Sequence, residues 1–293
     1  MKFKSLFFLL LCGFSFQAFA QDCFEQEWEA KSFPDSFRVK PFYMESAPAN
    51  PINITIDTSQ LINTVLPTHF ANNANGWMHF DWKQPGSRAL HNWKNANINF
   101  MRLPGGNWSS EYFWSGEVPF PVKLDYVDPK TDDWIMNNSD FMQLADSLNA
   151  EPVICVNYSL ARYADVDNPV QRAAQYAADW VRKVNVEMGL DVKYWEVGNE
   201  DHGPWQAGYV VDGDTITGTE YGRDFCVFVD SMKAVDSTIK IGAQVVNEDN
   251  GIVTYSGYNW WNKQVLPEVQ DKADFLITHE YFTWNSDPGQ ITV

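Results

Sequence analysis

An amide and a carboxylate side chain stand next to each other where an apolar stretch of the chain ends. Residues 193–197 read KYWEV, and Gly198, Asn199 and Glu200 follow directly. Successive side chains of a strand point to opposite faces, so Asn199 and Glu200 would diverge in a regular strand. Gly198 permits a bulge or break that brings both into one cleft. The pattern makes Glu200 a candidate catalytic acid, with Asn199 beside it.

Glu200 also has a simpler interpretation, as a structural glutamate at the start of a loop. For an arbitrary glutamate that interpretation is the better one. Here the adjacent Asn199, the aromatic neighbours Trp195 and Trp205 and the position at a strand end favour a functional site.

Polar side chains end other apolar runs as well. They are Asn72 and Asn73, Arg102 with Asn107, Asn157 and Tyr158, and His279 with Tyr281. A single polar strand end is usually a satisfied hydrogen bond, but several on successive strands indicate a site, because the carboxyl ends of barrel strands meet at one face. Alternation places His279 and Tyr281 on one face and Glu280 on the other, and the Gly105-Gly106 turn lets Asn107 approach Arg102.

The elements that must position these residues alternate between strand and helix. Between the apolar runs lie helix-length stretches, clearest at 168–188 and 218–236, the first with Asn168 as N-cap and Pro169 at its first position. This alternation predicts βα units and a parallel sheet, either doubly wound or an incomplete (β/α)₈ barrel. No G-x-G-x-x-G fingerprint follows the first run. The expected strands are 64–70 (TVLPTHF), 97–103 (NINFMRL), 151–158 (EPVICVNY), 191–197 (DVKYWEV), 238–246 (TIKIGAQVV) and 274–281 (DFLITHEY).

The N-terminal residues predict export. Residues 1–20 have Lys2 and Lys4, then an apolar run, then Ala18-Phe19-Ala20, which is the pattern of a signal peptide cleaved after Ala20. A membrane-spanning helix is the alternative, but the apolar run is short. Residues 21–55, with four prolines, predict an arm or linker, and residues 56–293 the catalytic domain.

Charge and composition limit the kinds of partner and cofactor that we expect. A formal charge of −17 disfavours nucleic acid and anionic membranes, and no membrane contact is expected after cleavage. The sequence has no C-x-x-C motif and no Cys/His cluster, so no metal is expected, and no cofactor is expected either. Cys155, in the apolar run PVICV, is expected in the core. The high aromatic content is compatible with a large core or with a cleft in which rings stack on sugars.

Three motifs resemble those of known sugar-cleaving enzymes. YWEVGNE at 194–200 resembles the fourth-strand signature of the clan A glycoside hydrolases. RLPGGNW at 102–108, with Tyr112 and Trp114 after it, and HEY at 279–281 resemble motifs of the family 51 α-L-arabinofuranosidases. The motifs follow the family's order over about residues 62–285. The resemblance selects the (β/α)₈ barrel, of which about six of eight units are expected here.

The resemblance also implies residue roles in a retaining hydrolysis with two carboxylates. Glu200 would be the acid/base and Asn199 would bind the sugar 2-hydroxyl. Arg102 would lie beside the nucleophile, because an opposite charge favours an ionised carboxylate. Tyr281 would hydrogen-bond the nucleophile, and His279 and Asn107 would support the site. Apart from the resemblance, the Trp-rich loops, Trp205 among them, would form an open cleft if the enzyme acts within chains.

Two departures from the family's pattern stand out. The family's sugar-binding glutamate after the first strand is replaced by HFANNANGW, so that Asn72 or Asn73 would substitute. The nucleophile, a glutamate ending the seventh strand in the clan, is expected beyond Val293, and Glu248 is a weaker internal alternative. The chain is therefore interpreted as an N-terminal fragment of the barrel.

The expected function is that of a secreted, retaining hydrolase acting on plant or algal polysaccharide, with α-L-arabinofuranosides as the leading substrates. Two alternatives remain open. One is an endo-acting glycanase of the same clan, of glucanase, agarase or xylanase type. The other is a non-catalytic protein that binds polysaccharide or oligosaccharide.

Overall fold

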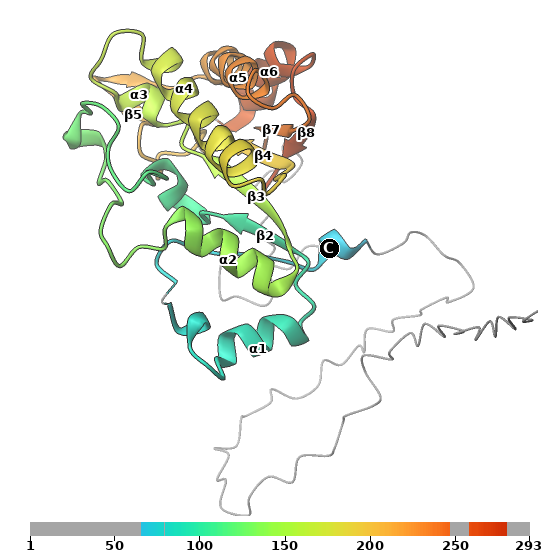
Figure 1. Ribbon diagram of the computed structural model, residues 1–293. Coiled ribbons are helices and arrows are strands. Elements are labelled where there is room, and N and C mark those ends of the chain that lie inside the picture. The colour runs from blue at the N-terminus through green and yellow to red at the C-terminus, as the bar shows by residue number, and fades with distance from the viewer. Residues whose placement is uncertain (1–65, 79, 247–257, 280–293) are drawn as a thin grey trace, which may run out of the picture. The chain divides into compact units, whose positions relative to one another are not determined.

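The computed structural model describes residues 66–78, 80–246 and 258–279 (Figure 1). The expected signal peptide, the arm at 21–55, Glu248, Glu280 and Tyr281 lie outside the described residues.

Six of the strands form one parallel sheet in the order β1-β2-β3-β4-β7-β8. This order follows the chain without reversal, which distinguishes a barrel from a doubly wound sheet. The described residues are thus part of a (β/α)₈ barrel, as predicted. The strands are β1 (Ala71–Asn73), β2 (Phe100–Leu103), β3 (Glu151–Val156), β4 (Tyr194–Val197), β7 (Lys240–Gln244) and β8 (Phe275–Ile277), and a separate antiparallel hairpin pairs β5 (Val210–Val211) with β6 (Asp214–Thr215).

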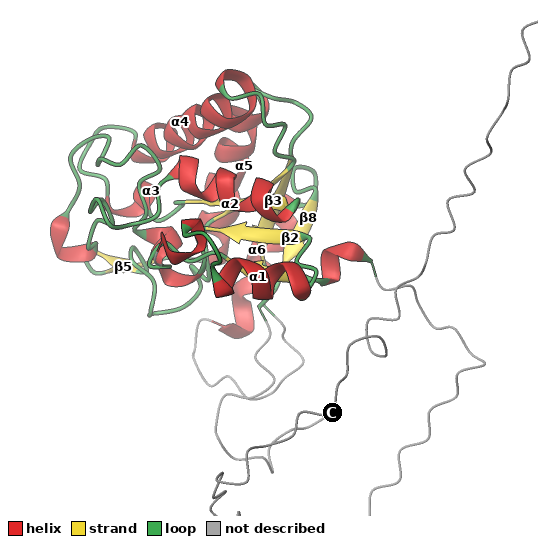
Figure 2. Ribbon diagram, turned by 60° about the horizontal axis from the view of Figure 1, so that its bottom comes forward, coloured by secondary structure: helices red, strands yellow, loops and turns green. Residues whose placement is uncertain are grey.

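Helices connect the parallel strands. Figure 1 shows α4, α5 and α6 together near β4, β7 and β8, and α1 and α2 near β2, while Figure 2 shows β2, β3 and β8 between α4 on one side and α1 on the other. The α-helices are α1 (Arg88–Asn95), α2 (Asn138–Leu148), α3 (Leu160–Tyr163), α4 (Pro169–Val181), α5 (Gly218–Lys233) and α6 (Tyr258–Val269). Shorter turns are the 3₁₀-helices η1 (Pro67–His69), η2 (Phe80–Lys83), η3 (Gly106–Ser110) and η4 (Leu124–Tyr126), and the π-helix η5 (Arg182–Glu187).

The two faces of the sheet carry different side chains. Leu103, Trp195 and Ile241 point to the helices and are fully buried in the core. The opposite face carries Tyr194 and Glu196, since alternate residues share a face. An open hollow of about 440 Å³ adjoins this second face. Its lining residues are Thr68, Phe100, Val153, Tyr194, Glu196, Lys240, Asp274 and Phe275.

The first expected strand is placed wrongly. Residues 67–69 of TVLPTHF form η1, and the strand begins only at Ala71. Pro67 fixes its own φ and has no N–H to donate to a sheet, so it suits the start of a helical turn. The Nδ1 atom of His69 accepts from the backbone N–H of Leu66 at 2.8 Å, which closes the turn.

The helix expected at 168–188 is present but differs at both ends. Pro169 occupies the first turn as predicted, whereas Asn168 makes no side-chain cap bond and has φ 54°. After Val181 the helix continues as the π-helix η5. The predicted apolar stripe is confirmed: Ala173, Tyr176, Ala177, Trp180 and Val184 are buried.

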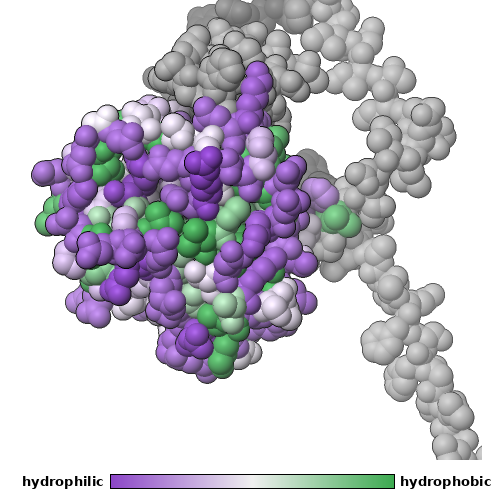
Figure 3. Space-filling model, turned by 90° about the horizontal axis from the view of Figure 1, so that it is seen from above, coloured by the Kyte–Doolittle hydropathy of each residue, from purple (hydrophilic) through white to green (hydrophobic). Residues whose placement is uncertain are grey.

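One face of the protein is mainly hydrophilic. Figure 3 shows a face on which hydrophilic residues predominate and hydrophobic residues form smaller patches. Across the described ranges, none of the helices combines the length and the apolar character needed to cross a membrane. Cys155 is fully buried, as expected for a core position.

Candidate active site

The turn after β4 places Glu200. Gly198 has φ 80° and Glu200 has φ 50°, so the backbone leaves strand geometry here, as was predicted from the glycine at position 198. A Cβ on Gly198 would lie 2.0 Å from Oδ2 of Asp201 and 2.4 Å from Nε2 of Gln244. Position 198 therefore needs glycine both for its φ and for its space. The left-handed conformation of Glu200 is uncommon for a residue with a side chain and is typical of functional sites.

Both carboxylate oxygens of Glu200 have neighbours from other parts of the chain. Trp205 donates from Nε1 to Oε2 at 2.7 Å, and Nδ1 of His279 lies 2.7 Å from Oε1. Glu200 is 9% exposed, whereas Trp205 is 39% exposed. The structure thus brings His279, from a separate segment, together with Glu200 and Trp205, and the sequence analysis had selected all three. The Glu200 carboxyl group has a fixed direction while Trp205 stays accessible.

Arg102 joins β2 to the turn after β4. Its Nε donates to Oε2 of Glu196 at 2.6 Å, and its Nη2 donates to Oδ1 of Asn199 at 2.9 Å. Burial by itself lowers the pKa of the Arg102 guanidinium, but the neighbouring acidic groups, Glu196 first among them, together hold that pKa above its ordinary value. Among the described residues, the carboxylate bonded to Arg102 is Glu196, which the sequence analysis did not select.

Asp201 anchors the turn that carries Glu200. Ser159 donates to Oδ1 of Asp201 at 2.7 Å and Gln244 donates from Nε2 to Oδ2 at 2.6 Å, while Oε1 of Gln244 accepts from the Asp201 N–H at 2.9 Å. Burial raises the pKa of Asp201 to about 7, although these hydrogen bonds act in the opposite direction. Glu200 is therefore held between β4 and the end of β7.

Asp201 should make the stability of the fold depend on pH. Its pKa rises from an ordinary 3.8 to about 7 on folding, so the folded state holds the proton more tightly. Its stabilising contribution is fully present below about pH 4 and is lost as the pH rises through about 7. The unfolding free energy should fall by up to roughly 1.4 kcal/mol per pH unit in this window.

Asp201→Asn resembles the protonated form and should remove this dependence. We expect urea unfolding between pH 4 and 8 to show a wild-type curve that declines relative to that of the variant. The comparison cancels the titration of other groups, such as Asp224, whose pKa burial raises to about 6. Parallel curves for the two proteins would contradict the prediction.

Asn107 is bonded to the loop that follows Glu200. Its Oδ1 accepts from Nε2 of Gln206 at 2.9 Å, and Oε1 of Gln206 accepts from Ser110 at 2.8 Å. These bonds connect η3 with the loop that carries Trp205. The approach of Asn107 to Arg102 stays a prediction.

Asn72 and Asn73 lie on opposite faces of β1. Asn73 pairs in register with Arg102 and therefore shares its face, whereas Asn72 pairs with Met101, which points to the helices. A Cβ on Gly105 would lie 2.8 Å from Cβ of Asn73, so the two loops are in close contact. Of the two alternatives, Asn73 is on the side of the site and Asn72 is not.

The polar residues that end β3 serve the scaffold. Oδ1 of Asn157 accepts from the N–H of Leu160, and its Nδ2 donates to the hydroxyl of Tyr163 at 2.8 Å. The hydroxyl of Tyr158 donates to Oδ2 of Asp224 at 2.9 Å. Not every polar strand end therefore belongs to the site.

His202 is a further residue of this region that sequence reasoning missed. Burial lowers its pKa to about 4, so the ring is neutral near pH 7. The ring lies edge-on to Trp205 at 6.0 Å and to Trp261 at 5.7 Å between centroids. The available signal for His202 was its position two residues after Glu200. Gln244, which holds Asp201, was also missed, and its signal was a polar side chain near the end of the fifth apolar run.

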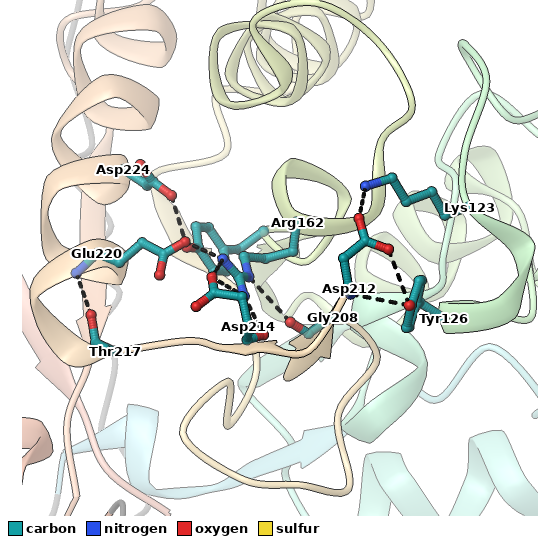
Figure 4. Close-up of polar contacts among 10 residues, drawn as sticks. Lys123, Tyr126, Arg162, Gly208, Asp212, Asp214, Thr217, Glu220 and Asp224 are labelled. Atoms are coloured by element: carbon teal, nitrogen blue, oxygen red, sulfur yellow. Dashed lines mark hydrogen bonds and ion pairs between the residues drawn. The ribbon is translucent and has the colours of Figure 1, made fainter.

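An ion-pair cluster anchors the loop that follows Trp205. Figure 4 shows Arg162 between the hairpin β5–β6 and α5. Its guanidinium donates to Asp214, to Glu220 and to the carbonyl of Gly208. At the hairpin turn, Lys123 pairs with Asp212 at 2.5 Å. The turn itself is Asp212-Gly213, both with positive φ, a pair that favours two-residue hairpins.

Metal ligation was not expected from the sequence. Within the part of the chain that the structure describes, no group of three or more His, Cys, Asp or Glu side chains is placed to hold a metal ion.

Known proteins match most of the chain. Residues 92–286 match the model of a family described as the α-L-arabinofuranosidase 1 domain. An intracellular exo-α-(1→5)-L-arabinofuranosidase of Bacillus subtilis (strain 168) is 28% identical over 197 residues, and one of Acetivibrio thermocellus is 26% identical over 197 residues. Each alignment covers 64% of this chain and 37% of the relative.

Solved structures share the fold. One is an α-L-arabinofuranosidase from Thermotoga maritima in complex with arabinose, at 24% identity and a TM-score of 0.53, covering 76% of this chain and 47% of the other. Another is a family 51 α-L-arabinofuranosidase from Bifidobacterium longum, at 22% identity and a TM-score of 0.55, covering 76% and 45%. At these identities the likeness concerns the fold. This chain spans less than half of the length of each of these proteins.

Proposed function

Because the chain belongs to the α-L-arabinofuranosidase 1 domain family, we propose that the whole protein is a retaining glycoside hydrolase that releases α-L-arabinofuranosyl groups from plant or algal polysaccharide. The observation that carries the proposal is the Glu200 carboxyl group, held at one oxygen by Trp205 and at the other by His279. The names of the relatives favour the arabinofuranoside as substrate.

Glu200 performs the proton transfers in this mechanism. As an acid it protonates the departing glycosidic oxygen, and as a carboxylate it then takes a proton from the water that attacks the glycosyl-enzyme intermediate. Asn199 binds the sugar beside it. Trp205 and His279 keep the carboxyl group in one direction through both steps.

The attacking carboxylate must be a second residue. In this scheme Glu196 holds Arg102, and Asp201 holds the turn through Ser159 and Gln244, and neither is assigned as the nucleophile. We place the nucleophile outside the described residues, on a later strand of the barrel, with Tyr281 as its hydrogen-bond donor. Glu248, the weaker alternative, is not the nucleophile in this scheme.

The test is a substrate panel with the full-length protein. We expect hydrolysis of 4-nitrophenyl α-L-arabinofuranoside, weak or no hydrolysis of the corresponding β-xylopyranoside and β-glucopyranoside, and an α-configured first product by NMR. Glu200→Gln is the matched variant, and it should lose steady-state turnover because the attack by water then lacks its base. A preference for another glycoside, or an inverted first product, would refute the proposal.

A second candidate, action within long glycan chains, has one observation in its favour. Trp77 and Trp134 are 44% and 53% exposed, and both contact Trp108 edge-to-face at 4.8 and 5.7 Å between centroids. A Cβ on Gly106 would lie 3.7 Å from Trp77, so this aromatic group begins beside Asn107. Exposed indole faces can stack on further sugar units. Oligosaccharide products from arabinan would support this second candidate. Single arabinose units would support the release of arabinofuranosyl groups proposed above, and binding without products would support a non-catalytic role.

Export is part of the proposal. The signal-like residues 1–20 support it, whereas both named relatives are intracellular enzymes. N-terminal sequencing of the mature protein from a cell-free medium or a periplasmic fraction should start at Gln21. A mature protein that retains Met1 in the cytoplasm would show that it is not exported.

A further inference from the structure

We propose that Glu196 is a positioning residue of the site: by holding Arg102, it sets the orientation of the Asn199 amide and presents Asn199 Nδ2 to the bound sugar. The identity of that ligand rests on the proposed function, but the geometry does not. The resemblance implied a role for Arg102 and Asn199 and none for Glu196.

The direction of the Asn199 amide follows from donor and acceptor chemistry. A guanidinium can only donate hydrogen bonds, so the atom that Arg102 Nη2 meets at 2.9 Å is the oxygen of Asn199. The nitrogen Nδ2 must then face the other way. Asn199 is 1% exposed, and its Nδ2 is buried without a hydrogen-bond partner among the described residues. A buried amide donor left unpaired is costly, which indicates that a ligand group or another part of the chain completes this bond.

Glu196 keeps Arg102 in the position from which it can do this. Arg102 stands on β2, whereas Asn199 follows β4, and β3 lies between these strands. A long, flexible side chain must therefore cross one strand and stay in place. The 2.6 Å charge-assisted bond from Nε to Glu196 fixes it to β4, the strand that carries Asn199.

The surroundings of the ion pair between Glu196 and Arg102 stabilise it. Glu196 is buried and Arg102 largely so, and each is the other's partner. Between them on β3 lies Cys155, whose pKa burial raises to about 12, so it remains an uncharged thiol. Its Sγ donates to the carbonyl of Gly198 at 3.0 Å, which supports the same turn. Glu196 thus acts on the substrate only through Arg102 and Asn199.

The test is a double-mutant cycle in the full-length protein. Glu196→Gln keeps an oxygen for Arg102 but removes the charge, and we expect kcat/KM on 4-nitrophenyl α-L-arabinofuranoside to fall ~10-fold or more. In an Asn199→Ala background the same change should cost less than about twofold, because its target is gone. Losses that multiply independently in the two backgrounds would overturn the inference.

The matched control is Glu220→Gln. It removes the charge of another glutamate paired with an arginine, Arg162, away from Asn199. We expect less than about a twofold change in kcat/KM. If Glu196→Gln does not fold, Arg102→Lys is the second variant, because lysine can pair with Glu196 but lacks the planar fork that also reaches Asn199. Wild-type kinetics for Arg102→Lys would overturn the inference.

A structural measurement separates this inference from the proposed function. The side-chain amide signals of Asn199, assigned in ¹H–¹⁵N NMR spectra by their loss in Asn199→Ala, should shift in Glu196→Gln and stay in place in Glu220→Gln. If the wild type cleaves no arabinofuranoside, the proposed function fails, and these spectra alone decide the inference. Unshifted signals in Glu196→Gln would overturn it whether or not the enzyme is active.

Discussion

Replacing Glu200 by alanine should slow hydrolysis of arabinan by about 10²–10⁴-fold, the usual contribution of general acid–base catalysis. Bond cleavage in a natural substrate needs a proton on a poor leaving group, and in the proposed mechanism Glu200 supplies it. An aryl arabinofuranoside with an acidic phenol needs little protonation, so formation of its glycosyl-enzyme should be much less affected. The later attack by water still needs a base, and added azide, which needs none, should restore turnover.

The measurement compares kcat/KM of Glu200→Ala on arabinan-derived oligosaccharides and on 2,4-dinitrophenyl α-L-arabinofuranoside. Azide rescue is measured as kcat on the aryl substrate with and without azide, because azide acts on the glycosyl-enzyme. Glu187→Ala is the control, because Glu187 forms an exposed i,i+4 ion pair with Lys183 on η5. That variant should behave like the wild type on both substrates. An equal loss of activity by Glu200→Ala on both substrates, without azide rescue, would exclude Glu200 as the acid/base.

Gly198→Ala should destabilise the fold and inactivate the site together. The added methyl group would meet Asp201 Oδ2 at 2.0 Å and Gln244 Nε2 at 2.4 Å, and φ is 80°. Overpacking of a well-packed site costs about 1–3 kcal/mol and a left-handed residue with a side chain about 1–2 kcal/mol. We expect the unfolding free energy to fall by roughly 2–5 kcal/mol, with activity lost because the turn that carries Glu200 must shift.

Gly213→Ala is the matched control for this variant. Gly213 also has positive φ, at 82°, but nothing lies within 4 Å of its would-be Cβ. It should therefore show only the backbone cost of about 1–2 kcal/mol and keep its activity. Urea unfolding and the aryl arabinofuranoside assay test both variants. Similar losses in the two would mean that the contacts of Gly198 with Asp201 and Gln244 do not matter.

Much of the barrel could be predicted from the sequence because it depends on local patterns. Apolar runs such as 151–158 and 191–197 place β3 and β4, and the Ala173 to Val184 stripe places α4. The failures are also local in origin. Pro67 converts the first expected strand into a helical turn, and the Asp212-Gly213 signal for the β5–β6 hairpin was present but not used.

The sequence by itself determined that Glu200 ends a buried strand next to an amide, and that Gly198 frees the backbone there. Side-chain alternation and glycine chemistry suffice for this, since both act within a few residues. The structure alone decided which side chains complete the site: the nearby Trp205 and the distant His279 on Glu200, and Glu196 rather than another carboxylate on Arg102. The contacts of His279 and Arg102 depend on how β2, β4 and β8 are arranged in one curled sheet, with β3 and β7 between them, and that register is a property of the whole fold.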